Sequence, residues 1–317
     1  MPTITLWRRL PVDTARVTGV LAIFGPTAVG KTAIAIAAAR RIAAHGGEVV
    51  AVGADALQLY AGLEVLTAAP TPDERAELDH RLVGSVPVTE EFSVARYARL
   101  AHAEIDGLLA TGTTPIVVGG TGLYLRAALA DLQLRPPPEP GVREGLMREL
   151  DALGPEALHA RLAAAAPWAA ERIGPRDRSR IVRSLELLAA GRLEPPPAEN
   201  ELWTAHTRHP TRLVGLVMDR DALVARIDAR VDEMVAAGVV DEVRRADAAG
   251  ASSTARAAVG FSEFLTGDID GAKVRTRRLA RRQLTWMRKL AGVELVDVTD
   301  RDADEVAAAL DLDSLRG

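Results

Sequence analysis

The 317-residue chain contains no cysteine. This absence excludes disulfide bonds, cysteine-ligated zinc and thiol catalysis within the chain, and it favours an intracellular, cytoplasmic protein. No apolar run approaches about 18 residues, so we expect no membrane-spanning helix. Aromatic residues make up only 3% of the chain, whereas hydrophobic residues make up 48%. The sequence can therefore form a sizeable core, rich in alanine, and its length predicts about two domains.

Acidic residues are missing from one long basic segment, although the net charge of the chain is -4. Residues 273–289 contain eight lysines and arginines and no carboxylate. A second cluster of arginines, between residues 172 and 183, is diluted by Glu171 and Asp177. Basic clusters on an acidic protein are typical of a face that binds a polyanion, and the alternative is a solvated helix face.

A glycine-rich motif follows the first apolar run, at residues 20–24. Its eight residues fit the pattern G-x-x-x-x-G-K-[ST] and precede an alanine-rich helical segment: Gly25, Pro26, Thr27, Ala28, Val29, Gly30, Lys31 and Thr32. In a strand–loop–helix of this kind, backbone N–H groups surround a phosphate and the helix N-terminus adds positive potential. We expect Lys31 to reach the outer phosphate oxygens and the Thr32 hydroxyl to contact Mg²⁺. The motif predicts a di- or triphosphate site.

Short apolar runs separated by helical patterns predict an α/β fold with a parallel sheet and helices on both faces. The expected strands are residues 20–24, 48–52, 115–118, 212–218 and 293–298. Residues 73–82 and 93–110 are helix candidates, with Ser93 as an N-cap and Gly112 as a stop signal.

Two proline clusters bound a segment without strand character. The first is the run of prolines between residues 135 and 140, and the second is residues 195–197. Three helices are expected between them, at residues 142–153, 155–165 and 178–190. We therefore divide the chain into a lead-in (1–18), a phosphate-loop core (19–134), a helical insertion (135–210) and a second part of the core with basic C-terminal helices (211–317). A continuation of the core helices is the alternative to an insertion.

The chemistry is expected at the carboxyl ends of the parallel strands. Asp55 follows the second strand, with Gln58 one helical turn later. The third strand ends in Gly119-Gly120-Thr121, where a nucleoside triphosphatase would carry an acidic residue. The glycines are expected to leave room for a ligand, and Thr121 supplies a hydroxyl. Without a hydrolytic acid, the site favours transfer to an acceptor, with Asp55 as base; a magnesium second-shell ligand and a helix cap are the alternatives for Asp55.

Arg226 and Arg230 are four residues apart on one predicted helical face, after the fourth strand. They are suited to clamp phosphate oxygens, because a guanidinium presents a planar fork of donors. Ion pairing with nearby Asp228, Asp232 or Glu233 is the alternative.

Taken together, these motifs resemble the tRNA dimethylallyltransferase (isopentenyltransferase) family over most of residues 20–300. The matching stretches are residues 25–32, 54–60, 92–97, 118–124, 180–186, 226–234, 259–261 and 280–288. The resemblance implies a P-loop NTPase-like fold whose loop holds the diphosphate of dimethylallyl diphosphate. It further implies transfer of the prenyl group to N6 of the adenosine 3′-adjacent to the anticodon of tRNA, with release of diphosphate.

The resemblance also implies roles for individual residues. Asp55 would be the general base, and Thr27, Lys31, Thr32, Arg226 and Arg230 would stabilise the leaving diphosphate, with Mg²⁺ as cofactor. The anticodon stem-loop of tRNA would contact a larger set: Asp55, Ala56, Leu57, Gln58, Thr121, Arg180, Arg183, Gly260, Arg281 and Arg282. Trp286 is either a base-stacking residue or a core residue. We expect a monomer.

The sequence departs from the family pattern at two positions. Ala69 and Ser262 stand where a lysine is usual. Three other functions stay open on the sequence alone: a prenyltransferase acting on free adenine nucleotides, a small-molecule kinase with ATP in the loop, and a nucleotide-binding regulatory module without turnover. A kinase would transfer a γ-phosphate, and a free-nucleotide enzyme would have no use for an RNA-binding insertion.

Overall fold

The structure is a computed structural model, and it describes residues 19–134, 141–195, 201–310 and 312. The expected lead-in (1–18) lies outside the described residues, and so do residues 135–140 and 196–200 of the two proline-rich segments. The chain divides into two compact units, one formed by residues 1–133 and 202–317 and the other by residues 134–201. Residues 202–210, which we expected in the insertion, thus belong to the first unit.

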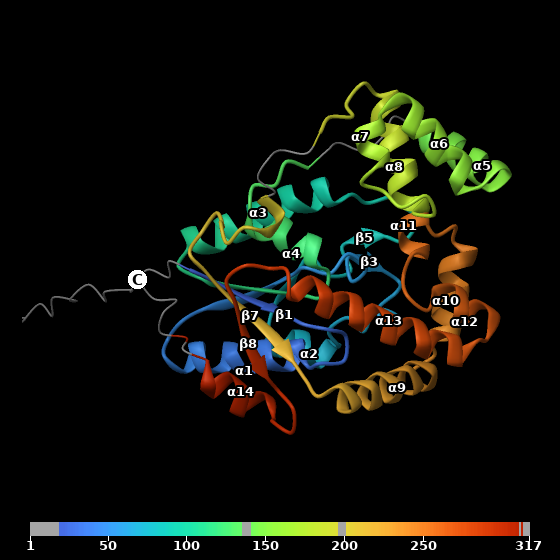
Figure 1. Ribbon diagram of the computed structural model, residues 1–317. Helices are drawn as coiled ribbons and strands as arrows, with labels where there is room; N and C mark the ends of the chain where they lie inside the picture. Colours follow the sequence, from blue (N-terminus) through green and yellow to red (C-terminus); the bar gives the residue numbers. More distant parts are fainter. Residues whose placement is uncertain (1–18, 135–140, 196–200, 311, 313–317) are drawn as a thin grey trace, which may run out of the picture. The chain divides into compact units, whose positions relative to one another are not determined.

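The first unit is built on a six-stranded parallel sheet with the order β4-β2-β6-β1-β7-β8 (Figure 1). Its strands are β1 (Val20–Phe24), β2 (Val49–Gly53), β4 (His80–Arg81), β6 (Thr114–Gly119), β7 (Thr211–Val217) and β8 (Val293–Asp297). All five predicted strands are therefore confirmed. Two further strands, β3 (Tyr60–Ala61) and β5 (Val86–Pro87), pair with each other, and neither these nor β4 was predicted.

Helices cover the sheet because its central strands are apolar on both sides. Every residue of β1 is buried. One face packs against α1 (Lys31–Ala44), which contacts α14 (Ala303–Ala309), while α3 (Val94–Ala110) and α4 (Gly122–Leu129) pack against each other and β6 (Figure 1). As predicted, Ser93 caps α3, its hydroxyl accepting from the N–H of Arg96.

The prediction of a helix over residues 73–82 is partly wrong. Helix α2 spans only Pro72–Glu77, with Thr71 and Glu74 forming a capping box at its start. The chain then extends, and His80 and Arg81 pair with Ala51 and Val52 of β2. Pairing with the exposed edge of the sheet outweighs the local helical pattern, since it satisfies backbone groups of both segments.

A short 3₁₀ turn at Glu201–Trp203 precedes β7. The remaining helices of the first unit come after β7. They are α9 (Arg220–Ala236), α10 (Val239–Ala248), α11 (Ser253–Arg256), α12 (Phe261–Thr266) and α13 (Ile269–Met287). Helices α9 and α13 pack against each other, and two ion pairs join them. Arg277 donates to both carboxylate oxygens of Asp228 at 2.8 and 2.7 Å, and Lys273 lies 2.6 Å from Asp232.

The second unit is helical and has its own hydrophobic core. Its helices are α5 (Val142–Leu153), α6 (Pro155–Ala165), α7 (Pro167–Ala170) and α8 (Arg178–Ala189). The three predicted helices are confirmed, and α7 is additional. Glu186 is the buried charged residue of this unit, and its carboxylate accepts from Arg143 at 2.7 Å and from Arg183 at 3.0 Å.

Within the described residues, none of the helices is both long and apolar enough to span a membrane.

We predict that Glu186→Ala destabilises the second unit by about 2 kcal/mol, because two arginines lose a fully buried carboxylate partner. Hydrogen exchange of the amides in α5 and α8 measures this loss. The matched control is Glu149→Ala, which removes an exposed ion pair with Arg161 and is expected to cost less than about 1 kcal/mol. Equal losses of stability in the two variants would show that the buried Glu186 carboxylate contributes no more than an exposed one.

Candidate active site

The glycine-rich motif forms the expected loop between β1 and α1. Gly30 has φ of +98°, a left-handed conformation that favours glycine, and it immediately precedes the first residue of α1. The loop thus leads directly into the N-terminus of α1. Thr27, Lys31 and Thr32 all line the cavity above this loop. This is the geometry of a phosphate-binding loop.

Two cations face the cavity in surroundings that disfavour their charge. Burial lowers the pKa of Lys31 to about 8, with Asp55 opposing the shift and Arg230 adding to it. Burial also lowers the pKa of Arg230. The Lys31 ammonium donates to the carbonyl oxygens of Gly25 and Pro26, at 3.1 and 2.9 Å. Neither cation has an ion-pair partner within the part of the chain that the structure describes. An anion bound here would supply the missing negative charge.

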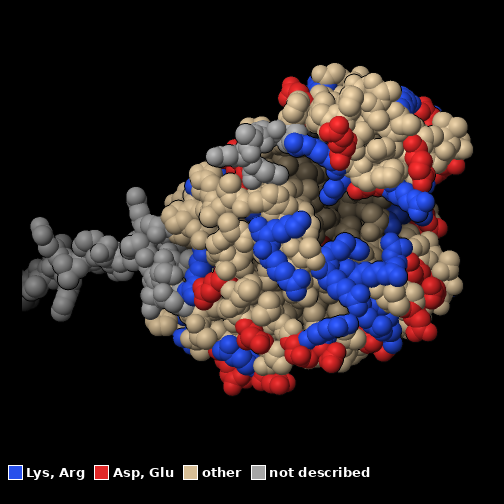
Figure 2. All heavy atoms as spheres, in the orientation of Figure 1, with Lys and Arg blue, Asp and Glu red and all other residues tan. Residues whose placement is uncertain are grey.

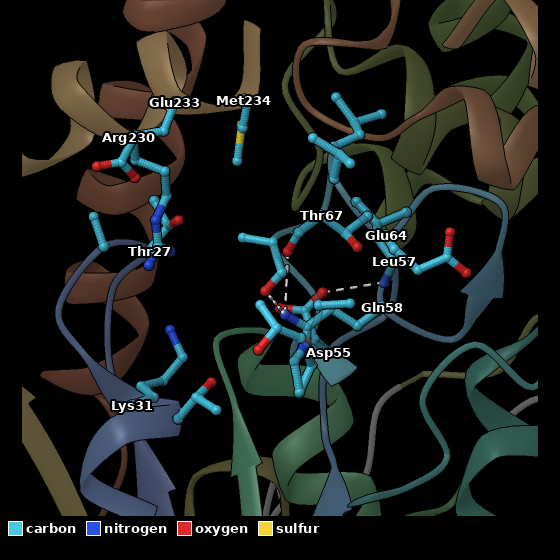
Figure 3. Close-up of a pocket in the computed structure, with 18 of the residues that line it drawn as sticks. Thr27, Lys31, Asp55, Leu57, Gln58, Glu64, Thr67, Arg230, Glu233 and Met234 are labelled. Atoms are coloured by element: carbon cyan, nitrogen blue, oxygen red, sulfur yellow. Dashed lines mark hydrogen bonds between the residues drawn. The ribbon is translucent and has the colours of Figure 1, made fainter. Parts of the chain in front are cut away.

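The opposite wall of the cavity is formed by the segment that follows β2 (Figure 3). Asp55 accepts from the N–H of Leu57 at 3.1 Å, which fixes its carboxylate at the start of this segment. Gln58 donates to the carbonyl oxygens of Thr67 and Ala68, at 3.1 and 3.0 Å. Figure 3 shows Lys31 and Thr27 on one side of the space and Asp55 on the other. The site thus places a carboxylate across from the phosphate-loop cations.

The cavity has a volume of about 800 Å³, enough for more than a phosphate group. Beyond the loop its walls include apolar side chains from the segment after β3 and from α9 and α12, among them Leu66, Met234 and Phe264. Glu64, Glu74 and Glu233 also line it. The cavity therefore combines a cationic floor with an outer part that carries both apolar side chains and three glutamates.

The glycines after β6 make room for protein atoms. A Cβ on Gly119 would lie 2.1 Å from the carbonyl oxygen of Ala54, and one on Gly120 would lie 2.3 Å from Nε2 of Gln283. Gly119 also borders the cavity, so our expectation that these glycines leave room for a ligand stays a prediction beside this packing role. Thr121 accepts a long hydrogen bond (3.4 Å) from the N–H of Ala56, which links the ends of β6 and β2.

A buried tyrosine, Tyr97, and a half-buried one, Tyr124, support the end of β2. The hydroxyl of Tyr97 donates to the carbonyl oxygen of Gly53 at 2.9 Å, and its ring packs against Tyr124 with ring centres 4.7 Å apart. Burial raises the pKa of both phenols, so both remain neutral donors. They hold the backbone directly before Asp55.

The two predicted arginines of α9 have different surroundings in the structure. Arg230 lines the cavity, whereas Arg226 is exposed and does not. Two of the three proposed ion-pair partners are engaged elsewhere, because Asp228 pairs with Arg277 and Asp232 pairs with Lys273. The third, Glu233, lines the cavity together with Arg230 and opposes the burial that lowers the pKa of Arg230. Of the predicted pair, Arg230 is therefore the one placed to contact a ligand in this cavity.

Other predicted residues lie outside the cavity. Gly260 is buried at the start of α12, where its φ of +94° and its contact with Phe264 account for a glycine. In the second unit, Arg183 pairs with the buried Glu186, while Arg180 is exposed and lies 3.5 Å from Asp177. Trp286 is half-buried and packs on Gly122 and Trp203, so it has a packing role at the edge of the core.

Helix α13 is divided into two electrostatic halves. In its first half, Lys273, Arg275 and Arg277 each pair with a carboxylate. In its second half and at its C-cap, the exposed arginines have no carboxylate partner among the residues described: Arg278, Arg281 and Arg282 on the helix and Arg288 directly after it. We call these four residues the basic stripe. Figure 2 shows lysine and arginine side chains gathered over this helix.

The donor set fits Mg²⁺ bound together with phosphate. Within the described residues there is no cluster of three or more acidic or histidine side chains able to hold a metal ion by itself. Mg²⁺ commonly takes one or two protein oxygens and completes its shell with phosphate oxygens and water. The Thr32 hydroxyl at the start of α1 and the cavity beside it match that arrangement.

The main functional residue that the motif analysis missed is Gln283. It is buried, it lines the cavity, and its Oε1 accepts from the N–H of Thr27 at 2.8 Å. Glu242 was also missed: its buried carboxylate accepts from the N–H groups of Val65 and Leu66, which border the cavity. The partners of both residues are far away in sequence, so no local pattern indicates them.

The fold and the site define a P-loop protein of the α/β class in which β6 ends in Gly119, where a nucleoside triphosphatase would carry an acidic residue. A family model described as IPP transferase matches residues 58–290. The chain belongs to the IPP transferase family.

Named relatives agree with this membership. A tRNA dimethylallyltransferase of Anaeromyxobacter dehalogenans is 45% identical over 285 residues, which cover 86% of this chain and 90% of the relative. A tRNA dimethylallyltransferase of Thermobifida fusca is 42% identical over 281 residues, which cover 85% of this chain and 87% of the relative. The crystal structure of the full-length tRNA isopentenylpyrophosphate transferase of Bacillus halodurans superposes with a TM-score of 0.65 at 33% identity, covering 92% of this chain and 93% of that one.

We predict that diphosphate affinity depends on pH through Lys31. The protonated ammonium binds the anion, and its pKa of about 8 in the free protein means that affinity is full below pH 8 and falls as pH rises above it. Titration calorimetry with inorganic diphosphate over this pH range measures this. Because diphosphate itself loses its last proton in the same range, the readout is the ratio of wild-type affinity to Lys31→Met affinity at each pH. This ratio should fall as pH rises above about 8, and a ratio that does not change with pH would contradict the role of Lys31.

Proposed function

We propose that this protein is a tRNA dimethylallyltransferase. It transfers the dimethylallyl group of dimethylallyl diphosphate to N6 of the adenosine 3′-adjacent to the anticodon. The observation that carries the proposal is the arrangement of Lys31 and Arg230, two desolvated cations facing the Asp55 carboxylate across one cavity. A phosphate loop without a hydrolytic acid holds a diphosphate as a leaving group, and the family membership gives the acceptor.

In the proposed reaction, N6 of adenosine attacks C1 of the dimethylallyl group while the bond between C1 and the diphosphate oxygen breaks. An exocyclic amine is a weak nucleophile and must lose a proton as the new N–C bond forms. Asp55 takes this proton, since its carboxylate lies across the cavity from the phosphate loop and is held by the N–H of Leu57. The products are the prenylated base and diphosphate.

The phosphate loop stabilises the charge that develops on the leaving diphosphate. Lys31 and Arg230 supply positive charge, and the loop N–H groups and the N-terminus of α1 supply fixed dipoles. Mg²⁺ bound at Thr32 would neutralise further negative charge on the diphosphate. In the free protein the Lys31 ammonium is held by the carbonyl oxygens of Gly25 and Pro26, so it is already placed at the loop.

The basic stripe of α13 is suited to bind the phosphate backbone of the RNA. Its four arginines are exposed and, among the residues that the structure describes, have no carboxylate partner, whereas the neighbouring cations of the same helix are neutralised. The stripe favours tRNA over a free adenine nucleotide as acceptor, because a mononucleotide has no extended backbone to contact it. The helical second unit, with Arg180 exposed, is proposed to clamp the anticodon stem-loop. We further propose a monomer.

We predict that Asp55→Ala retains binding of dimethylallyl diphosphate but lowers the transfer rate by about two to four orders of magnitude, the usual effect of losing a general base. Radiolabel transfer to unmodified tRNA, together with calorimetry of diphosphate binding, separates the two effects. Asp55→Asn is the control for shape, and it should be equally slow. A rate near that of the wild type would rule out Asp55 as the base.

We predict that the double substitution Arg281→Ala and Arg282→Ala weakens tRNA binding and makes it less sensitive to salt. The slope of log affinity against log salt concentration should become shallower by about one to two. The reason is that each arginine that no longer neutralises an RNA phosphate reduces the slope by about one. The matched control is Lys273→Ala with Arg275→Ala, two ion-paired cations of the same helix. The control pair should leave the slope nearly unchanged. The stripe would be a solvated face if both pairs gave the wild-type slope.

A further inference from the structure

Gln283 lies at the meeting point of two strand-end loops. It belongs to α13, and its side chain is buried, with only 6% of the residue exposed. Its amide oxygen accepts from the N–H of Thr27 in the phosphate loop at 2.8 Å. Its amide nitrogen lies where a Cβ on Gly120 would approach to 2.3 Å, so the glycine after β6 makes space for it.

The contact with Thr27 concerns one particular peptide unit of the phosphate loop, the one between Pro26 and Thr27. The carbonyl oxygen of this unit accepts from the Lys31 ammonium at 2.9 Å, and its N–H donates to Gln283 at 2.8 Å. The plane of this peptide unit is therefore held at both ends, by the charged Lys31 ammonium and by the neutral amide of Gln283.

These two anchors respond differently to a ligand. A diphosphate in the loop attracts the Lys31 ammonium toward its own oxygens and away from the carbonyl groups. The amide of Gln283 is neutral, and the N–H that it accepts from belongs to the loop backbone. It can therefore keep its hydrogen bond when the lysine changes partner.

Resting on the function proposed above, we propose that Gln283 is a positioning residue for the phosphate loop. It holds the Pro26–Thr27 peptide plane when Lys31 engages the diphosphate, and it thereby keeps Thr27 and the following N–H groups directed at the leaving group. Gly120 is part of the same device, since the amide occupies the space that its missing side chain leaves. Gln283 acts through Thr27 and is not itself a phosphate ligand.

The direct test is the exchange rate of the Thr27 amide proton, measured by NMR in the free protein and with inorganic diphosphate bound. Gln283→Leu removes the acceptor, and Gln283→Glu retains one. We expect faster exchange in the leucine variant, protection in the glutamate variant, and about three- to tenfold weaker diphosphate binding for leucine. Thr285→Val, which changes an exposed hydroxyl of the same helix bonded to the carbonyl oxygen of Arg281, is the matched control and should match the wild type.

Gly120→Ala gives an independent route to the same result if the leucine variant does not fold. The added methyl group displaces the Gln283 amide from the other side while the glutamine remains, so exchange at Thr27 should again increase. The double variant Gly120→Ala with Gln283→Leu should exchange the Thr27 amide proton hardly faster than either single variant, because both changes break the same hydrogen bond.

Two results would overturn the proposal. One is a Thr27 exchange rate that is the same in Gln283→Leu and the wild type. The other is a leucine variant that binds diphosphate normally and loses affinity only for the RNA. Failure of the proposed function is distinguishable, because the wild type itself would then bind no diphosphate or transfer no prenyl group, whatever the exchange rates show.

Discussion

The site depends on the cost of keeping two cations largely out of water with no carboxylate at ion-pair distance among the residues that the structure describes. Burial lowers the pKa of Lys31 to about 8 and lowers that of Arg230 as well, and both side chains face the same cavity. An ion pair would remove this cost but would also block the site. The protein instead holds Lys31 on two loop carbonyl oxygens, which stabilise the ammonium weakly enough for an anionic ligand to displace them.

The rest of the first unit maintains this arrangement from a distance. Tyr97 fixes the end of β2 before Asp55, and Gln283 fixes the loop from α13. Glu242 of α10 anchors the segment that forms the outer wall, through the N–H groups of Val65 and Leu66. Each contact joins a cavity segment to a buried side chain of a different element. The positions of the reacting groups thus follow from the packing of the whole unit around the parallel sheet.

The sequence was sufficient for the features that depend on local patterns. The five long strands, the capped helix α3 and the phosphate loop each follow from a run of neighbouring residues. Strand β4 was predicted as a helix because its two residues extend only to pair with β2. The separation of Arg230 from Arg226, and the pairing of Arg183 with Glu186, depend on which side of a helix packs inward. Gln283 could not be assigned a role in advance, because its partner lies 256 residues away.

The central claim is that the cavity joins a diphosphate leaving group to an adenosine of tRNA. The most direct measurement is transfer of label from dimethylallyl diphosphate, with Mg²⁺ present, to an unmodified anticodon stem-loop that carries adenosine 3′-adjacent to the anticodon. A stem-loop with guanosine at that position and free AMP and ATP serve as matched acceptors. Our account predicts label only in the adenosine-containing stem-loop. Label in the free nucleotides alone, or in none of the acceptors, would contradict it.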